Sequence, residues 1–231
     1  MNKTKIDWAD MTWNPVTGCL HGCEYCYARK IAKRFDGTKA FPNGFEPTIH
    51  NDRLIEPQKV EKPQNIFVCS MADLFGSWVP ESWIEQVFDA CKKAPQHNYL
   101  FLTKNPLRII DEDTPTAKNM WFGSSFTRNS DDFVSNRRKS NPERNYFLSI
   151  EPILEDVLTD LATIHCFERV NWVIVGAETG NRTNKVIPKK EWIDKIVYHC
   201  KEAGIPLFMK DSIRELMGNE FAQELPEGLM K

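Results

Sequence analysis

Three cysteines close together near the start of the sequence limit most strongly what this chain can be. Cys19, Cys23 and Cys26 fall within eight residues and have the spacing C-x3-C-x2-C. Three thiolates on one tight loop can hold three irons of a cubane cluster and leave the fourth iron open to a small molecule. Gly18 and Gly22 let the backbone wrap closely around such a cluster. The spacing therefore predicts a metal or cluster site.

The remaining cysteines do not suggest a disulfide framework. Of the seven in the chain, the other four are scattered singly, at Cys69, Cys91, Cys166 and Cys200. Cys91 and Cys200 fall on apolar helical faces, where a cysteine behaves as a small core residue. The N-terminal segment is polar and lacks the apolar stretch of a secretory signal, and no apolar run is long enough for a membrane span. We therefore expect a cytoplasmic protein whose thiols stay reduced and which has no membrane partner.

Two other uses of the three cysteines stay open at this point. They could bind zinc with His21, His50 or a distant residue as the fourth ligand, although zinc sites more often pair two C-x2-C units and no second pair exists here. They could also hold a cluster that only relays electrons or senses oxygen.

The rest of the chain alternates predicted strands and helices. Its 231 residues suffice for one domain with a sizeable core. Short continuous apolar runs predict buried parallel strands at 65–69, 99–103, 120–124, 146–150, 172–176 and 206–209, and one more strand is expected before Cys19. This alternation predicts an α/β fold, a partial (β/α) barrel of about six to seven parallel strands. A doubly wound sheet is the alternative, and the pattern does not separate the two.

Helical periodicity is clearest at 81–94 and 189–203, where apolar residues recur on one face. Gly204 and Pro206 predict the end of the second of these helices. Shorter helices are predicted at 131–139 and 155–163. Residues 36–63 are rich in proline, glycine and charge, so we interpret them as a loop-rich insertion in a single domain that spans 1–231.

Polar residues follow several of the predicted strands. In an α/β barrel the carboxyl ends of the strands carry the ligand-binding groups. We expect such roles for Ser70 and Asp73 after the strand at 65–69, for Ser125 after 120–124, and for Ser149 and Glu151 at the end of 146–150. Asp73 suits an ammonium partner, with a role as a turn cap as the alternative, and the hydroxyl of Ser125 can reach a ribose.

The cysteine motif resembles the signature of the radical S-adenosylmethionine superfamily. Tyr25 adds to the resemblance, because that family usually has an aromatic residue just before the last cysteine. Further segments, in the same order, resemble a family of phage and bacterial proteins of unassigned function, and together they cover almost the whole chain. These segments are residues 12–19, 26–28, 68–75, 102–106, 149–152, 173–180 and 208–210.

The resemblance implies two cofactors, a [4Fe–4S] cluster and S-adenosyl-L-methionine. It implies that the amino and carboxylate groups of S-adenosylmethionine chelate the open iron. An electron from the cluster then breaks the sulfur–carbon bond, which gives methionine and a 5′-deoxyadenosyl radical. It also places contacts to the methionine amino group at the end of the second strand, where Ser70 and Asp73 stand.

The substrate and the redox partner are less defined. We expect an external electron donor of the flavodoxin or ferredoxin type. The phage-like resemblance and local basic clusters suggest a nucleotide or nucleic acid as the substrate. The net charge of −2 gives no global basic signal. Four cations gather after the cysteines, at Arg29, Lys30, Lys33 and Arg34. A solvated helix face is the commoner interpretation of such a cluster, and contact with a phosphate backbone is the alternative.

Overall fold

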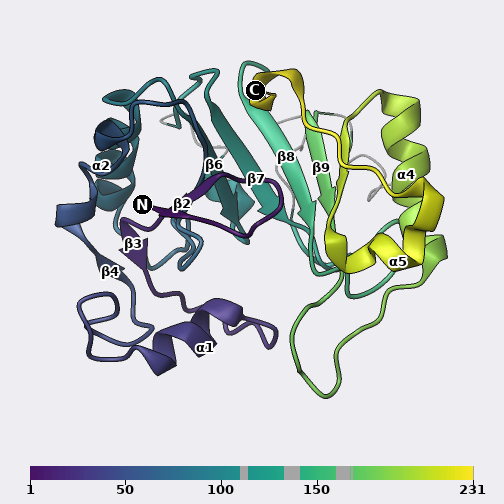
Figure 1. Cartoon of the computed structure of the whole chain (residues 1–231), viewed down its shortest axis with the longest axis horizontal. Coiled ribbons are helices and arrows are strands. Elements are labelled where there is room, and N and C mark those ends of the chain that lie inside the picture. Colours follow the sequence, from purple (N-terminus) through teal and green to yellow (C-terminus); the bar gives the residue numbers. More distant parts are fainter. Residues whose placement is uncertain (110–113, 133–140, 160–166, 168, 231) are drawn as a thin grey trace. The chain divides into compact units, whose positions relative to one another are not determined.

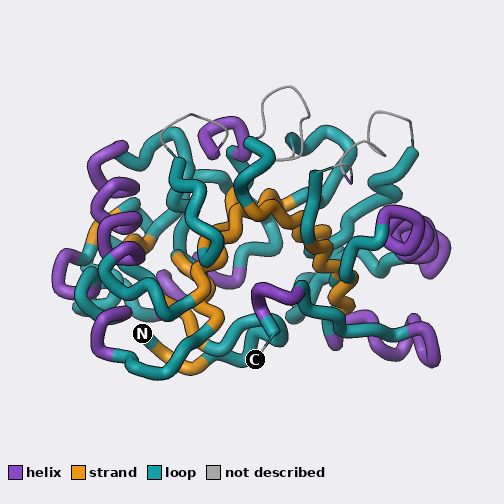
Figure 2. The backbone as a smooth tube through the Cα atoms, turned by 90° about the horizontal axis from the view of Figure 1, so that it is seen from above, coloured by secondary structure: helices purple, strands orange, loops and turns teal. Residues whose placement is uncertain are grey.

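The computed structural model describes residues 1–109, 114–132, 141–159, 167 and 169–230. The chain forms two compact units, Met1–Asn105 and Pro106–Lys231. Most of their helices and strands are labelled in Figure 1, and all can be followed by type in Figure 2.

The first unit contains a four-stranded part of a sheet in the order β1-β2-β5-β6. Its strands are β1 (Asn2–Lys3), β2 (Met11–Trp13), β5 (Asn65–Val68) and β6 (Asn98–Thr103). β1 runs antiparallel to β2, whereas β2, β5 and β6 run parallel. All four residues of β5 are buried, which explains why its sequence is a continuous apolar run.

Two helices belong to the first unit. They are α1 (Tyr27–Arg34) and α2 (Glu81–Lys92). α2 packs its apolar face on the sheet, where the ring of Phe88 lies 5.5 Å from that of Phe101 in β6. α1 buries only Ala28 and Ala32, so most of its surface is open.

The loop-rich insertion predicted at 36–63 contains little regular structure. Strand β4 (Thr48–Ile49) pairs antiparallel with β3 (Val16–Thr17). Two single 3₁₀ turns follow, at Asn51–Arg53 and Pro57–Lys59. The pairing of β3 with β4 places part of the insertion directly beside the segment that leads into the cysteines.

The second unit contains four parallel strands in the order β7-β8-β9-β10. They are β7 (Met120–Ser125), β8 (Asn145–Ile150), β9 (Trp172–Val175) and β10 (Leu207–Met209). Helix α4 (Lys190–Ala203) connects β9 to β10 and ends at Gly204, whose φ of 64° is the left-handed geometry that glycine adopts readily. A short helix, α5 (Arg214–Met217), follows β10. Single 3₁₀ turns occupy Pro106–Ile109, Asp211–Ile213, Gly218–Glu220 and Glu227–Leu229.

The six predicted strands and the two main helices are all present, with bounds shifted by at most two residues. The helix predicted at 155–163 is wrong over 155–159, where the chain is irregular and contains bends at 155, 157 and 159. There Asp156 accepts a hydrogen bond from the backbone N–H of Leu158 (3.3 Å), a local turn that competes with a helix. The helix predicted at 131–139 is not formed at 131–132, and the rest of both segments, like Cys166, lies outside the described residues. No helix of the described chain is long and apolar enough to cross a membrane.

Candidate functional site

The loop that carries the three cysteines, residues 18–26 (the cysteine loop), is held by backbone hydrogen bonds to two other segments. The N–H of Gly18 donates to the carbonyl of Met71 just after β5 (2.9 Å), and the N–H of Cys19 donates to the carbonyl of Phe45 in the insertion (3.1 Å). Gly18 also forms a parallel bridge with Ala72. The cysteine loop therefore lies at the carboxyl end of β5, and the insertion is hydrogen-bonded to it at Cys19.

Gly18 is where the chain passes closest to the insertion. Its φ is 90°, and a Cβ on it would lie 2.7 Å from the backbone nitrogen of Pro47 and closer still to the carbonyl of Glu46. Only glycine fits such an approach. Gly22 also has a positive φ of 77°, but a Cβ there would meet nothing within 4 Å. Gly22 is thus needed for backbone geometry alone, and Gly18 for geometry and space.

The last cysteine begins helix α1. The Sγ of Cys26 accepts a hydrogen bond from the backbone N–H of Arg29 (3.3 Å), as an N-cap side chain does. The guanidinium of Arg29 donates to the carbonyl of Cys23 (3.3 Å), and that carbonyl also accepts from the N–H of Cys26 (3.3 Å). The thiol of Cys26 therefore caps the N-terminus of α1.

All three loop cysteines are free and partly exposed. Burial, the largest cause, raises the pKa of the Cys19 thiol to about 11, and the negative charge of Asp73 adds to this, while a backbone hydrogen bond at His21 acts in the opposite direction. A bound metal cation would instead lower the pKa of a cysteine thiol, because a coordinating thiol is deprotonated. Three thiols on one loop match the donor set of a cubane cluster, which takes one cysteine on each of three irons. The residues present therefore fit such a cluster.

The scattered cysteines have a different character. Burial raises the pKa of Cys69 and Cys200 to about 12 and that of Cys91 well above its usual value. All three are buried, as expected for core residues. Among the described residues, no group of three or more His, Cys, Asp or Glu side chains is placed to hold a single metal ion. The three loop cysteines are included in this, so donor type and spacing alone support a cluster there.

Asp73 joins the cysteine loop to the ends of two strands. Its buried carboxylate accepts hydrogen bonds from the Nε2 of His21 (2.7 Å), the backbone N–H of Phe75 (3.0 Å) and the backbone N–H of Lys104, just after β6 (2.9 Å). The bond from Phe75 is the turn cap that was the alternative role for this residue. His21 also packs its ring edge against Trp78, with centroids 4.8 Å apart. From the sequence, His21 was a candidate only as a zinc ligand, although its place between two cysteines marked it as part of the loop.

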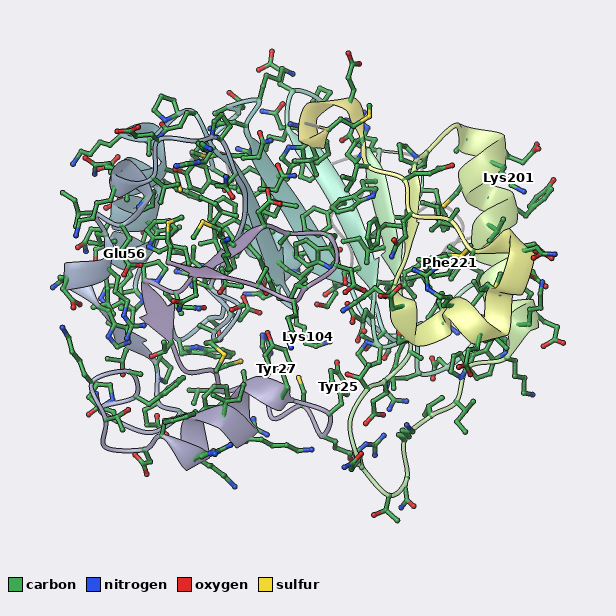
Figure 3. All side chains as sticks on the ribbon, viewed as in Figure 1. Tyr25, Tyr27, Glu56, Lys104, Lys201 and Phe221 are labelled. Atoms are coloured by element: carbon green, nitrogen blue, oxygen red, sulfur yellow. The ribbon has the colours of Figure 1, made fainter. Side chains whose placement is uncertain are left out.

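Two tyrosines flank the last cysteine (Figure 3). The Nζ of Lys104 lies 5.6 Å from the ring centroid of Tyr25, within cation–π range. The hydroxyl of Tyr27 donates to the carbonyl of Ser70 (2.8 Å), and the Oγ of Ser70 donates to the side-chain oxygen of Asn14 (3.1 Å). Tyr25 is therefore part of the cysteine loop, and Asp73 and Ser70 are bonded to His21 within it and to Tyr27 just after it.

The other predicted contacts belong to the second unit. Ser125 and Ser149 are register partners on β7 and β8. The hydroxyl of Ser149 is buried and has no hydrogen-bond partner within the described chain. Glu151 forms an ion pair with Lys210, which follows β10. These residues gather at the carboxyl ends of the strands of their own unit, as predicted.

A second ion pair of the second unit stands after β9. The buried carboxylate of Glu178 is held by Arg182 through two hydrogen bonds, 2.6 Å from Nε and 2.7 Å from Nη2. Hydrogen bonding from Arg182 lowers the pKa of Glu178. The pair fixes the start of the long loop between β9 and α4.

The arrangement defines a class of protein by its fold. Two solved structures of spore photoproduct lyase match with TM-scores of 0.57, at 12% and 11% identity, over 90% of this chain and 78% of theirs. Both are mutant forms of that enzyme, and the second holds bound AdoMet and dinucleoside spore photoproduct. At this identity the likeness shows the fold alone. It confirms the predicted fold class, a mostly parallel α/β fold of the partial-barrel kind, similar to that of spore photoproduct lyase.

The family follows from the sequence itself. A family model described as "Protein of unknown function (DUF5131)" matches residues 3–219, and the chain belongs to this family. A search of curated proteins finds no match.

Proposed function

We propose that this protein binds a [4Fe–4S] cluster through Cys19, Cys23 and Cys26 and cleaves S-adenosylmethionine reductively as a radical enzyme. One observation carries the proposal. The three-thiol loop stands at the carboxyl end of a parallel strand in a fold that also occurs in a structure with bound AdoMet. A relay or sensor role for the cluster and a zinc-stabilised module are less favoured, because neither explains this similarity.

When bound, the cluster supplies one electron that splits S-adenosylmethionine into methionine and a 5′-deoxyadenosyl radical. The protein's own groups hold the cysteine loop and its three thiols in position. Arg29 and the N-terminus of α1 hold the backbone around Cys23 and Cys26. His21 and Asp73 tie the loop to β5 and β6. A loop fixed in this way keeps its thiols in place without reorganisation.

The residues proposed to contact S-adenosylmethionine are those at the predicted strand ends and in the cysteine loop, Tyr25, Ser70, Asp73, Ser125, Ser149 and Glu151. The unpartnered hydroxyl of Ser149 supports this set, since a buried hydroxyl without a hydrogen bond within the described chain costs free energy. The carboxylate of Asp73 already accepts three hydrogen bonds and has capacity for about one more. It can therefore meet an ammonium group without losing its present partners.

The proposed substrate is a nucleotide or nucleic acid. The support is a similar structure that holds a dinucleoside spore photoproduct. The proposed partner is an external one-electron donor of the flavodoxin or ferredoxin type. We expect the protein to work in the cytoplasm, where the cysteines, all free among those described, stay reduced.

The test is anaerobic reconstitution with iron and sulfide, followed by incubation with S-adenosylmethionine and dithionite. We expect four irons per chain, as a cubane requires, and 5′-deoxyadenosine measured by mass spectrometry. A four-iron cluster without any 5′-deoxyadenosine would leave only the relay or sensor role. Zinc in place of iron in anaerobically purified protein would favour the binding module.

A further inference from the structure

Helix α1 exposes apolar side chains although it lies on the surface of the first unit. Tyr27, Ile31 and Phe35 follow one another at four-residue spacing, the last at the C-cap, and are 52%, 39% and 45% exposed. Residues four apart share one side of a helix. The two buried residues of the helix, Ala28 and Ala32, lie beside this row, because each stands three residues before one of its members. A surface helix normally turns its apolar side inward, so an outward apolar row indicates an interaction site.

Cations stand beside this row. Lys30, Lys33 and Arg34 are all exposed, and the helix has no acidic residue between Tyr27 and Arg34. The whole chain has a net charge of −2, so the positive charge is local to α1. We call Lys30, Lys33 and Arg34 with the apolar row the α1 face. An acidic partner with an apolar centre complements such a surface in both charge and composition.

The α1 face is connected to the cysteine loop by short contacts. The helix begins at Cys26, whose Sγ is hydrogen-bonded to the N–H of Arg29. Arg29 also holds the carbonyl of Cys23. A partner bound on the α1 face therefore sits on the helix whose N-cap is one of the three proposed cluster ligands.

We propose that the α1 face docks an acidic one-electron carrier protein, which reduces the cluster. This inference rests on the proposed function. One electron leaves the reduced carrier and enters the cluster, so the carrier is oxidised by one electron and the cluster is reduced by one, and no covalent bond forms. The other described cysteines are buried singly, so the described chain shows no second cluster ligand set from which that electron can come.

The two aromatic rings argue for a protein rather than a nucleic acid on this face. Single-stranded nucleic acids stack their bases on open aromatic rings. The guanidinium of Arg34 lies over the ring of Phe35, 5.7 Å from its centroid. The hydroxyl of Tyr27 is tied to the carbonyl of Ser70 (2.8 Å), which fixes the direction of its ring (Figure 3). These contacts hold both rings in place as half-exposed apolar surface, which suits the apolar centre of a protein interface.

The experiment compares two charge-reversal variants of the reconstituted protein. The first is K30E/K33E/R34E. The matched control is K59E/K62E/K93E, which makes a similar change in charge at exposed residues near the other end of β5 and after α2. Binding of a purified acidic flavodoxin is measured by calorimetry at low and at higher ionic strength. We expect about tenfold weaker binding for the first variant, a flatter salt dependence, and wild-type affinity for the control.

Measuring 5′-deoxyadenosine formation with two electron sources separates an effect on carrier docking from an effect on the reaction itself. With flavodoxin and its reductase as the electron source, 5′-deoxyadenosine formation by K30E/K33E/R34E should fall about tenfold at limiting flavodoxin. With dithionite it should equal that of the wild type. A third variant, F35S, should weaken flavodoxin binding and keep the salt dependence, because it removes only apolar contact. Unfolding temperature and iron content of all variants confirm that the fold and the cluster are intact.

Three outcomes decide the matter. Equal flavodoxin affinity for the first variant and the control would overturn the inference. So would loss of oligonucleotide binding by K30E/K33E/R34E with flavodoxin affinity unchanged, because the face would then serve nucleic acid. If wild-type protein with dithionite makes no 5′-deoxyadenosine, the proposed function fails, and the binding comparison still judges the surface by itself.

Discussion

The substitution Gly18→Ala tests whether the insertion and the cysteine loop are built as one unit. The φ of 90° at Gly18 costs an alanine roughly 1–2 kcal/mol. The new Cβ would also lie 2.7 Å from the backbone nitrogen of Pro47 and closer still to the carbonyl of Glu46. Backbone atoms cannot rotate away, so we add roughly 1–3 kcal/mol for overpacking. The total loss is about 2–5 kcal/mol.

Gly22→Ala is the matched control. It introduces the same methyl group in the same loop at a φ of 77°, but with no atom within 4 Å. It should therefore cost only the conformational part, about 1–2 kcal/mol. In thermal unfolding of the cluster-free protein, Gly18→Ala should lower the midpoint by about 10 °C and Gly22→Ala by about 4 °C.

The second readout is iron bound per chain after reconstitution. Gly18→Ala should reduce it, because making room for the methyl group moves the backbone of Cys19 away from its hydrogen bond to Phe45 (3.1 Å). Gly22→Ala should retain most of the iron. If the two variants unfold at the same temperature, the close approach of the insertion to Gly18 is not what holds the loop, and the reasoning is refuted.

Three further predictions concern the cysteines and the ion pairs. Alanine at any one of the three loop cysteines should abolish cluster binding measured by iron content, while Cys91→Ala should retain it; loss of iron in the latter would refute the ligand assignment. Asp73→Ala leaves buried donors unpaired and should cost about 2–4 kcal/mol in urea unfolding, whereas Asp89→Ala, at an exposed ion pair, should cost less than about 0.5 kcal/mol. Because Arg182 lowers the pKa of Glu178, their pairing stabilises the fold above the ordinary pKa of a glutamate and loses this effect as the pH falls through the lowered value. Unfolding midpoints measured from neutral pH into the acid range should therefore fall less steeply in Arg182→Ala than in the wild type, and identical slopes would contradict this.

The strands and main helices were predictable because their signals are local. The buried run of β5 and the apolar face of α4 with Gly204 behind it are visible in single short windows of sequence. The helix expected at 155–163 failed over its described part for a local reason as well. The side chain of Asp156 accepts a hydrogen bond from the backbone N–H of Leu158 and so stabilises a turn in place of a helix. Apolar periodicity carries no information about such a side-chain bond.

In the candidate site, too, the features set by local sequence were predictable and the contacts between distant segments were not. The donor set and its loop were predictable, since ligand spacing is a property of consecutive residues. The pairing of His21 with Asp73 was not, because 52 residues separate the two and only the register of β2 with β5 brings their segments together. The support that Phe45 gives to Cys19 was equally hidden, because it comes from an insertion without periodicity.

The sequence alone thus defined the candidate donor set, three cysteines at a fixed spacing, and the apolar strands of the fold. The tertiary structure decided how those cysteines are held. Gly18 fits against Glu46, Asp73 accepts the hydrogen bond of His21, and α1 turns an apolar and basic face outward. The physical reason is that covalent spacing sets which ligands can share a cluster. Contacts between distant segments depend on strand register and packing, which no single stretch of sequence encodes.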